Sequence, residues 1–247
     1  MQDIDFFGRA TTMESRFERG ITVRISMNEF PNSFAQVIDL SHPITQQMPV
    51  YPGTQSPKIT PVNTLDHDGF LEHSITMVTH TGTHLDVPAH MIPAGRTLDS
   101  FGAEVFVDSA VVLDVRTAGP VVERSFIEAH QRTLKGCRWV LLGTSWSDRW
   151  GSPEYFEGYP ALSPEAATWL VEQGIVGVGI DAISIDRADS QDFPVHQILL
   201  GNDVLVIENL TNLLPLVGQR FVFSAPPLAL AGVDGSPVRA VALLNQS

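Results

Sequence analysis

The sequence has little cysteine, few basic residues and no long hydrophobic run. Cys137 is the only cysteine in 247 residues, which excludes an intrachain disulfide and favours a reducing compartment. It lies in an apolar stretch and is expected to be a small core residue rather than a nucleophile. No stretch resembles a membrane span, and residues 1–20 lack the apolar segment of a secretory signal. A cytoplasmic protein is therefore expected.

Acidic residues outnumber basic ones, with 28 Asp and Glu against 15 Lys and Arg and a formal net charge of −13. This balance argues against nucleic acid or an anionic membrane as a partner, because phosphate surfaces would repel the chain. The length fits one domain with a substantial core, and the hydrophobic content of 43% is that of a soluble globular protein. The charge does not identify a substrate.

Residues 1–35 differ from the rest of the chain because they show no clear hydrophobic period. They are interpreted as a disordered tail or as an arm that packs on a neighbouring subunit, and their apolar side chains favour some ordered packing. A weak alternation predicts a short strand at 23–27. We divide the chain into an N-terminal extension, 1–35, and one domain, 36–247.

The most informative segment runs from His80 to His90. It holds three histidines and one aspartate, with His84 four residues after His80 and Asp86 two residues after His84. Two imidazoles and a carboxylate suit a divalent metal with open coordination positions. A single histidine in a polar loop usually satisfies only local hydrogen bonds, but a cluster of this density predicts a metal site.

The conformation expected for this segment is a tight loop. Gly82 allows a sharp turn between the first two histidines, and Pro88 stiffens the exit, so a helix is disfavoured. Alternation over 71–79 predicts a strand that ends in this loop at the rim of the sheet. Strand parity would place His73 on the opposite face from His80, and His73 is therefore left out of the metal set.

The remaining pattern predicts an α/β fold: a single domain with a mixed β-sheet and flanking helices. Ser163 is a suitable N-cap for a helix that Pro164 begins and Gly174 ends. A buried strand precedes this helix and another follows it, which implies a parallel crossover. Besides the strands at 23–27 and 71–79, further strands are predicted from short apolar runs, namely 36–40, 110–113, 139–143, 175–180, 204–207, 221–225 and 240–244.

Two aromatic residues are candidate substrate contacts. Tyr51 lies in the proline-rich segment 48–61, which is expected to be a loop of the kind that lines ligand pockets. Trp146 follows the buried strand at 139–143, and ligands bind at the carboxyl ends of strands in open α/β sheets. The Trp146 ring could stack on an aromatic substrate or could instead cap the core.

The segment 80–90 is similar to the H-x-G-T-H-x-D-x-P-x-H signature of the cyclase-like metal-dependent hydrolases. That family includes bacterial kynurenine formamidases and isatin hydrolases. The likeness extends to the opening segment 38–53, to 179–186, and to the closing segment 234–239. It also includes His196, which is followed twelve residues later by Glu208. The resemblance covers about 37–243, with its parts in the expected order.

The resemblance implies the swivelling β/β/α fold of the family and a homodimer or homotetramer. It implies that His196 and Glu208 complete a ligand set with His80, His84 and Asp86. If Asp86 bridges, these side chains can hold one or two ions, with zinc favoured by the imidazoles and manganese compatible with the carboxylates. The carboxylates Asp181 and Asp186 are interpreted as parts of a mainly structural turn.

The expected chemistry is hydrolysis by metal-activated water, with His90 as the general acid/base. The first hypothesis is cleavage of the carbon–nitrogen bond of an aryl formamide, such as N-formylkynurenine. The second is ring opening of a cyclic amide, such as isatin, or of a lactone. A hypothesis of another class is a metal-dependent ligand-binding protein without turnover. The presence of every motif residue favours an enzyme.

Overall fold

The computed structural model describes residues 13–16, 22–25 and 34–245. Two short strands, β1 (Met13–Arg16) and β2 (Thr22–Ile25), form an antiparallel pair in the N-terminal extension. β2 agrees with the strand predicted at 23–27, of which residues 26 and 27 lie outside the described residues. The interpretation of 1–35 as a tail or a subunit contact also concerns residues that mostly lie outside them.

Among the described residues, nine strands form one mixed sheet in the order β14-β6-β12-β11-β9-β7-β13-β15-β3. The central strands β12, β11, β9 and β7 are parallel, and the flanking pairs are antiparallel. The strand bounds are β3 Gln36–Asp39, β6 His84–Asp86, β7 Val107–Asp114, β9 Trp139–Gly143, β11 Gly177–Ile180, β12 Leu205–Glu208, β13 Arg220–Ser224, β14 Gly235–Pro237 and β15 Val241–Leu244. The mixed α/β sheet predicted from the sequence is confirmed.

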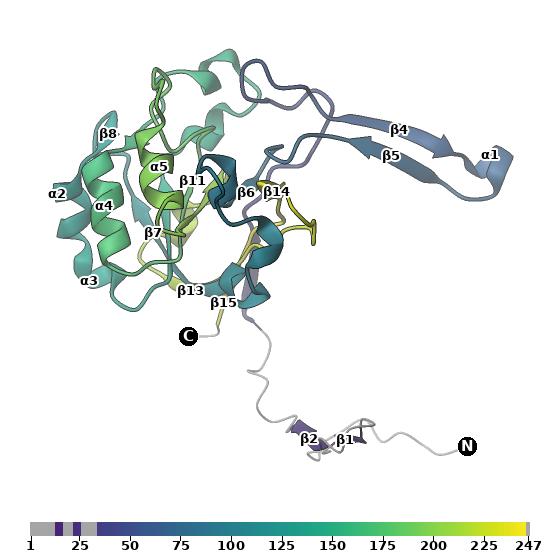
Figure 1. Cartoon of the computed structure of the whole chain (residues 1–247), viewed down its shortest axis with the longest axis horizontal. Helices are drawn as coiled ribbons and strands as arrows, with labels where there is room; N and C mark the ends of the chain where they lie inside the picture. The colour runs from purple at the N-terminus through teal and green to yellow at the C-terminus, as the bar shows by residue number, and fades with distance from the viewer. Residues whose placement is uncertain (1–12, 17–21, 26–33, 246–247) are drawn as a thin grey trace.

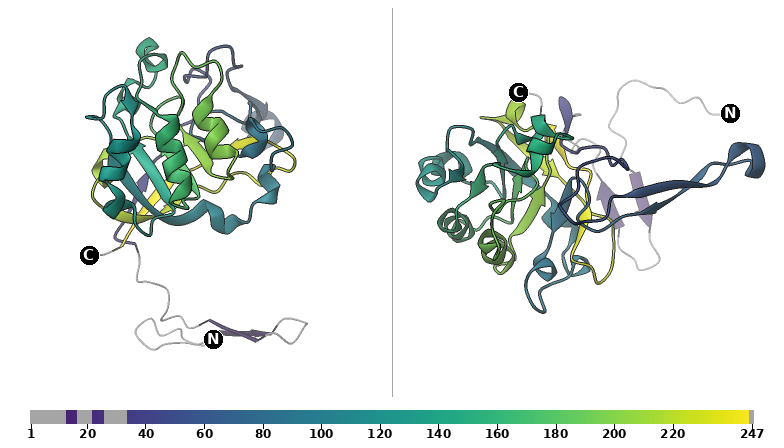
Figure 2. Two further views of the ribbon diagram at one scale, coloured as in Figure 1. Left: turned by 60° about the vertical axis from the view of Figure 1, so that its left-hand side comes forward. Right: turned by 90° about the horizontal axis from the view of Figure 1, so that it is seen from above.

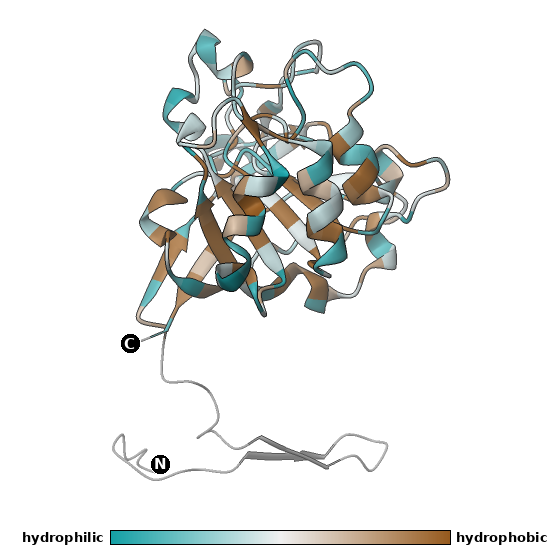
Figure 3. Cartoon of the chain, turned by 90° about the vertical axis from the view of Figure 1, so that its left-hand side faces the viewer, coloured by the Kyte–Doolittle hydropathy of each residue, from teal (hydrophilic) through white to brown (hydrophobic). Residues whose placement is uncertain are grey.

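Two cores sandwich this sheet. Along β7, Val111 and Leu113 enter the core under the helices, whereas Ala110 and Val112 enter the core on the opposite face. Both faces of the central strands are buried, which explains their continuous apolar sequences. Figure 1 shows the helices along one side of the sheet, and Figure 3 shows the apolar strands behind them.

The helices are short, and the best of them is the one that the sequence predicts. α4 spans Pro164–Glu172, and the Ser163 hydroxyl accepts a hydrogen bond from the Ala166 N–H at its start. This cap satisfies one of the free N–H groups of the first turn. The other helices are α1 Leu65–Asp68, α2 Arg124–Ala129, α3 Gln131–Leu134 and α5 Pro194–Leu200. The 3₁₀ turns are η1 Pro88–His90, η2 Leu98–Ser100, η3 Ala103–Phe106, η4 Trp146–Arg149, η5 Pro153–Phe156 and η6 Leu214–Leu216.

Two small pairs of strands complete the described part of the chain. β8 (Val121–Val122) and β10 (Ala161–Leu162) are parallel. β4 (Lys58–Asn63) and β5 (Glu72–Thr76) form a hairpin that extends away from the domain, with α1 near its tip (Figures 1 and 2). Within the described residues, no helix combines the length and apolar character needed to cross a bilayer.

The hairpin corrects two expectations from the sequence. Part of the predicted loop at 48–61 is strand β4, which accommodates Pro61 because an unsupported two-stranded ribbon has free edges. The strand predicted at 71–79 ends at Thr76 and pairs with β4 rather than with the main sheet. Alternation alone predicted a strand but could not identify its partner.

The ligand segment corrects a third expectation. A tight turn forms around Gly82, as predicted, but His84–Asp86 is strand β6 within the main sheet rather than a loop at its rim. β6 is paired on both sides, with β12 and with β14. Its backbone hydrogen bonds are therefore made within the sheet, which makes the ligand strand stiffer than a loop would be.

Candidate functional site

Strand β6 carries His84 and Asp86 on one face of the sheet and Leu85 on the other. Leu85 is fully buried in the core opposite the helices. This alternation is the normal consequence of a strand conformation. In the antiparallel pair of β6 and β12, Glu208 lies directly opposite His84. Strand register therefore brings three of the predicted ligands together.

His80 reaches the same cluster from the turn before β6. Gly82 has φ +66°, a left-handed conformation that glycine adopts without strain. Gly235 of β14 leaves room for the His80 imidazole, because a Cβ atom at position 235 would lie 2.8 Å from His80 Cε1. His80 Nδ1 lies 2.6 Å from Asp86 Oδ1, and His80 Nε2 lies 3.0 Å from Asp234 Oδ2. The ring is therefore held between two carboxylates.

His196 enters from the first turn of α5, where Asp186 fixes its position. The Asp186 carboxylate accepts hydrogen bonds from the backbone N–H groups of Val195 and His196 and from His196 Nδ1 at 2.6 Å. His196 Nε2 then lies 3.2 Å from Glu208 Oε1 and 3.6 Å from Asp86 Oδ2. Asp186 is thus part of the site and not only of a structural turn, since it sets the tautomer and the orientation of a ligand imidazole.

Among the described residues, donor atoms converge in three groups, of which two share Asp86 and the third is His80, His90 and Asp234. One group is His80, His84 and Asp86, and the other is Asp86, His196 and Glu208; within each, the ligand atoms lie within 4.8 Å of one another. Asp86 Oδ1 faces the first group, whereas Oδ2 faces the second and is buried without a hydrogen-bond partner. A buried carboxylate oxygen with no partner, surrounded by imidazole nitrogens, is suited to binding a cation.

The histidine tautomers support the same conclusion. His84 Nδ1 donates to the Gly82 carbonyl at 2.8 Å, which leaves the Nε2 lone pair facing Asp86 and Glu208. His196 is arranged in the same way by its bond to Asp186. Metal-ligating histidines commonly use one nitrogen for the ion and the other for such a partner. The residues therefore fit one or two divalent ions.

The charges of the cluster perturb its acid–base groups strongly. Burial acts to lower the pKa of His80, but hydrogen bonds and charges from Asp86 and Asp234 outweigh it and raise the pKa to about 9. Burial likewise opposes the ionised form of Asp86, but the surrounding histidines hold the pKa of Asp86 well below its usual range. A cation in the cluster would thus replace protons as the counter-charge of these carboxylates.

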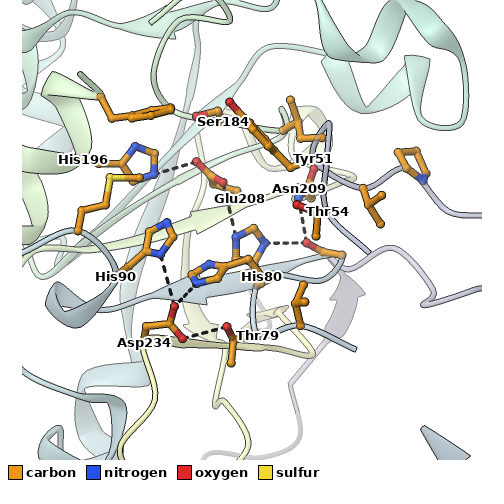
Figure 4. A pocket seen from close by; sticks show the side chains of 18 residues that line it. Tyr51, Thr54, Thr79, His80, His90, Ser184, His196, Glu208, Asn209 and Asp234 are labelled. Carbon is orange, nitrogen blue, oxygen red and sulfur yellow. Dashed lines mark hydrogen bonds and ion pairs between the residues drawn. The ribbon is translucent and has the colours of Figure 1, made fainter. Parts of the chain in front are cut away.

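His90 lies beside the ligand cluster on η1. Its ring centroid is 3.9 Å from that of His80, and its Nδ1 atom lies 3.6 Å from Asp234 Oδ2. Burial lowers the pKa of His90, and the neighbouring histidines add to this effect. Asp234 also accepts a hydrogen bond from the Thr79 hydroxyl at 2.9 Å. The structure therefore links Asp234 to both His80 and His90 (Figure 4).

Asn209 secures the turn that presents the ligands. It has φ +57°, uncommon for a residue with a side chain. Its Nδ2 donates to the Gly82 carbonyl at 2.9 Å, and its Oδ1 accepts from the Tyr155 hydroxyl at 2.8 Å. The backbone carbonyl of Asn209 accepts from the Thr83 hydroxyl. Because the Gly82 carbonyl also accepts from His84, this buried network controls the position of a ligand histidine.

A cavity of about 470 Å³ opens directly onto the cluster. Figure 4 shows His80, His196, Glu208 and Tyr51 around it. Its apolar lining comes mainly from segments distant in sequence, namely Pro49, Val50, Val78, Met91, Ile183 and Phe193. This size is typical of a site for a small organic ligand.

The two aromatic candidates have different places in the structure. Tyr51 lines the cavity, as a substrate contact should. Trp146 is not among the lining residues: its ring packs against the core under the helices, and its Nε1 donates to the Tyr155 carbonyl at 2.9 Å. The geometry of Trp146 is therefore that of a residue capping the core, the alternative considered from the sequence.

Sequence reasoning did not identify Asp234, Asn209 or Thr79 as site residues. Asp234 belongs to a segment that resembles the family, but an Asp-Gly pair by itself indicates only a turn. Asn209 directly follows Glu208, but its role depends on contacts with residues more than a hundred positions away. These contacts leave no local pattern in the sequence.

The chain is similar to known proteins along most of its length. The Cyclase family, described as "Putative cyclase", matches residues 38–187. The kynurenine formamidase of Bacillus mycoides is 30% identical over 208 residues, covering 84% of this chain and 97% of that protein. The kynurenine formamidase of Salinibacter ruber is 33% identical over 209 residues, covering 83% of this chain and 96% of that protein.

Solved structures agree on the fold. An isatin hydrolase bound to the product analogue thioisatinate superposes with a TM-score of 0.78 at 24% identity, over 85% of this chain and 93% of that one. Isatin hydrolase A from Ralstonia solanacearum superposes with a TM-score of 0.73 at 30% identity, covering 85% of this chain and 92% of that one. The resemblance inferred from the 80–90 motif is thereby confirmed, and the chain belongs to the cyclase family of hydrolases.

Proposed function

We propose that this chain is a metal-dependent hydrolase that cleaves the carbon–nitrogen bond of an aryl formamide with water. The observation that carries the proposal is the pair of ligand groups that share Asp86 at the base of a cavity. The kynurenine formamidases of two organisms, aligned over nearly their full length, support the choice of substrate class.

The proposed ligands are His80, His84, Asp86, His196 and Glu208, with Asp86 facing both groups. A divalent ion bound there would polarise the substrate carbonyl and lower the pKa of a bound water towards about 7. Imidazole-rich sites favour zinc, and the two carboxylates are compatible with manganese. The second group of three donors supports the binding of two ions.

His90 is proposed as the group that moves the proton. Its Nδ1 faces Asp234, which leaves Nε2 for the substrate side. During hydrolysis the water oxygen bonds to the formyl carbon, the carbon–nitrogen bond breaks, and His90 passes the proton from the water to the leaving nitrogen. The products are an aryl amine and formate. The lowered pKa of His90 makes the neutral ring the resting form near neutrality, ready to accept that proton.

The apolar wall of the cavity supports an aromatic substrate. Val50, Ile183 and Phe193 provide apolar surface in the same cavity as the ligand groups, and Tyr51 adds an aromatic ring. A planar aryl group would lie against these side chains while its formamide group faces the histidines. Tyr51 is the proposed substrate contact of the two aromatic candidates.

Ring opening of a cyclic amide is the second candidate. The isatin hydrolase from Ralstonia solanacearum matches at 30% identity and supports it. The same groups would act on a carbonyl within a ring, and the leaving nitrogen would remain attached to the product. The single buried Cys137 supports a cytoplasmic location. A homodimer or homotetramer is proposed as the working assembly.

Paired substitutions at neighbouring histidines test the division of roles. His80→Ala removes a ligand and is expected to lower the bound metal, measured by elemental analysis of purified protein. His90→Ala is expected to retain the metal and to lose turnover by about 10²–10⁴-fold, the usual contribution of general acid/base catalysis. Normal turnover by the His90 variant would remove His90 from that role.

A substrate panel separates the remaining hypotheses. Aryl formamides, cyclic amides and lactones are assayed with the metal-loaded chain, and product formation is measured beside binding. Turnover of the formamides in preference to the rings is expected. Preference for the rings would establish the second candidate, and binding without product would favour a ligand-binding protein.

A further inference from the structure

Asp234 lies in the segment that leads into β14 and belongs to the third donor group, with His80 and His90. It lines the cavity, and its side chain is 41% exposed, so it differs from the buried carboxylates Asp86 and Glu208. The proposed ligand set does not include it. Its contacts nevertheless join the two rings on which metal binding and proton transfer are proposed to depend.

Both oxygens of the Asp234 carboxylate have partners. Oδ2 lies 3.0 Å from His80 Nε2 and 3.6 Å from His90 Nδ1, so it is placed between the two rings. Oδ1 accepts a hydrogen bond from the Thr79 hydroxyl at 2.9 Å. Figure 4 shows these three contacts, with the carboxylate below both imidazoles. The bond to Thr79 restrains the rotation of the carboxylate, which keeps Oδ2 directed at the rings.

The backbone around Asp234 is fixed as well. The Asp234 carbonyl accepts a hydrogen bond from the Val87 N–H at 3.1 Å, one residue before η1. The next residue, Gly235, pairs with Asp86 in the antiparallel register of β14 and β6. Asp234 is therefore held against both the strand that carries the ligands and the turn that carries His90.

A carboxylate accepts hydrogen bonds but cannot donate them, so it determines which nitrogen of a neighbouring imidazole carries the proton. With a cation in the first ligand group, the His80 proton belongs on Nε2, which faces Asp234. The lone pair then belongs on Nδ1, which lies 2.6 Å from Asp86 Oδ1 within that group. Metal-ligating histidines commonly have this arrangement, with one nitrogen for the ion and the other donating to a carboxylate.

The same oxygen decides the tautomer of His90. A proton on Nδ1 faces Asp234, and the lone pair of Nε2 is then free to accept a proton from water. The opposite tautomer would have N–H on Nε2 and could not act as the base. The distance of 3.6 Å is longer than a hydrogen bond, but contacts of this kind commonly shorten when a substrate is bound.

We propose that Asp234 is a positioning residue that sets the tautomers of both His80 and His90, so that one carboxylate supports metal binding and proton transfer together. Within the described residues, Asp234 is the carboxylate that lies within 4.0 Å of a nitrogen of both rings. The part that concerns His90 rests on the proposed function, whereas the part that concerns His80 requires only a bound cation.

The direct test is a long-range ¹H–¹⁵N NMR spectrum of the zinc-loaded chain, which shows the nitrogen that carries the proton in each imidazole. The signals are identified by their loss in His80→Gln and His90→Gln. The wild-type chain is expected to have the proton on Nε2 of His80 and on Nδ1 of His90. In Asp234→Ala the His90 signal is expected to become that of a mixture of tautomers. The opposite tautomer at either ring of the wild-type chain overturns the proposal.

Kinetics and metal affinity give a second test with Asp234→Asn, which keeps the shape of the side chain but adds an amide that donates. With the metal in excess, kcat for an aryl formamide is expected to fall about 10–10³-fold with KM unchanged, a part of the usual contribution of a general base. Metal affinity, measured by competition with a chelator, is expected to fall about 10–100-fold. Asp234→Glu is expected to recover part of both losses.

Asp99→Asn is the matched control. Asp99 accepts a hydrogen bond from the Gly232 N–H, two residues before Asp234, and the variant is expected to keep wild-type kcat and metal affinity. Equal losses in this control, or normal kcat and metal affinity in Asp234→Asn, overturn the proposal. If the wild-type chain hydrolyses no formamide, the proposed function fails, and the tautomers and the metal affinities still decide the role of Asp234.

Discussion

Two neighbouring stretches of this chain have opposite environments. Between Lys58 and Thr76 no residue is buried, whereas every residue from Thr81 to Pro88 is buried. The hairpin exposes apolar side chains, and the ligand segment buries polar ones, among them His84 and Asp86. Each stretch thus reverses the usual rule that apolar groups are inside and polar groups outside.

The reversal has the same physical meaning in both stretches. Buried polar groups without partners cost free energy, and so does an extended apolar surface in water. In the ligand segment the missing partner is a cation, indicated by the unpaired oxygen of Asp86. In the hairpin the large apolar side chains remain more than half exposed. Both stretches therefore depart from the usual burial pattern at a cost in free energy.

The sharpest test of the contrast compares Leu85→Ala with Ile75→Ala. Leu85 is fully buried, so truncation is expected to lower the free energy of unfolding by about 2–5 kcal/mol through the cavity it leaves. Ile75 is 57% exposed, and its truncation in the monomer is expected to cost no more than about 0.5 kcal/mol. Urea unfolding curves measure both changes.

The same unfolding measurements can be repeated at different protein concentrations. If Ile75 packs on another copy, the effect of its truncation grows at high concentration, where assembly stabilises the wild-type chain. The effect of Leu85→Ala should stay the same at every concentration. An Ile75 effect that is equally large in dilute and concentrated samples would contradict the contrast.

The buried region also contains a carboxylate whose titration should be visible in stability. Burial raises the pKa of Asp181 to about 6, although its Oδ1 accepts hydrogen bonds from the Thr144 N–H and hydroxyl. The folded state therefore binds the Asp181 proton more tightly than the unfolded state. The stability that this protonation contributes is lost as the pH rises from about 4 to about 6.

Asp181→Asn removes the ionisation and retains an oxygen that can accept the Thr144 hydrogen bonds. Relative to wild type, the variant is expected to gain stability as the pH rises through that window, by up to about 3 kcal/mol. Unfolding free energies at pH 4 and pH 7 measure the gain. Glu72→Gln on the hairpin is the control, expected to change stability by no more than about 0.5 kcal/mol. A difference in unfolding free energy between wild type and Asp181→Asn that does not change with pH would contradict a raised pKa for Asp181.

A smaller effect is expected when a ligand loses only its supporting group. Asp186→Asn weakens the hold on His196 Nδ1 and is expected to reduce metal affinity about 10–100-fold, measured by competition with a chelator. Asp189→Asn is a suitable control, since Asp189 is exposed and pairs only with Arg187 near the same segment. Unchanged affinity in the Asp186 variant would limit Asp186 to a structural role.

Much of the fold could be predicted because its central strands are buried on both faces. Runs such as Val140–Leu142 are apolar on successive residues, which distinguishes them from half-exposed strands. The hairpin was harder to predict, because a strand with no sheet behind it has no burial pattern to reveal its partner. β6 was missed because it is short and two of its three residues are polar.

The candidate site shows the same division. Residue types and the spacing of His80, His84 and Asp86 were sufficient to predict that these side chains lie together, since a strand places alternate residues on one side. Trp146 was proposed from its place after a strand, but its ring turns to the core rather than to the cavity. The direction of a side chain at a strand end depends on the packing around it, and local sequence does not predict that packing.

The sequence by itself determined the chemistry available to this protein: clustered imidazoles and carboxylates, a single cysteine, and apolar strands able to hold them rigidly. Only the tertiary structure decided which distant groups complete the cluster, because the register of β12 against β6 places Glu208 beside His84. It also decided that Asp186 contacts His196 and that Asp234 contacts both His80 and His90. The same holds for residues 58–76, none of which is buried. These outcomes depend on long-range packing and strand pairing, which local sequence patterns do not encode.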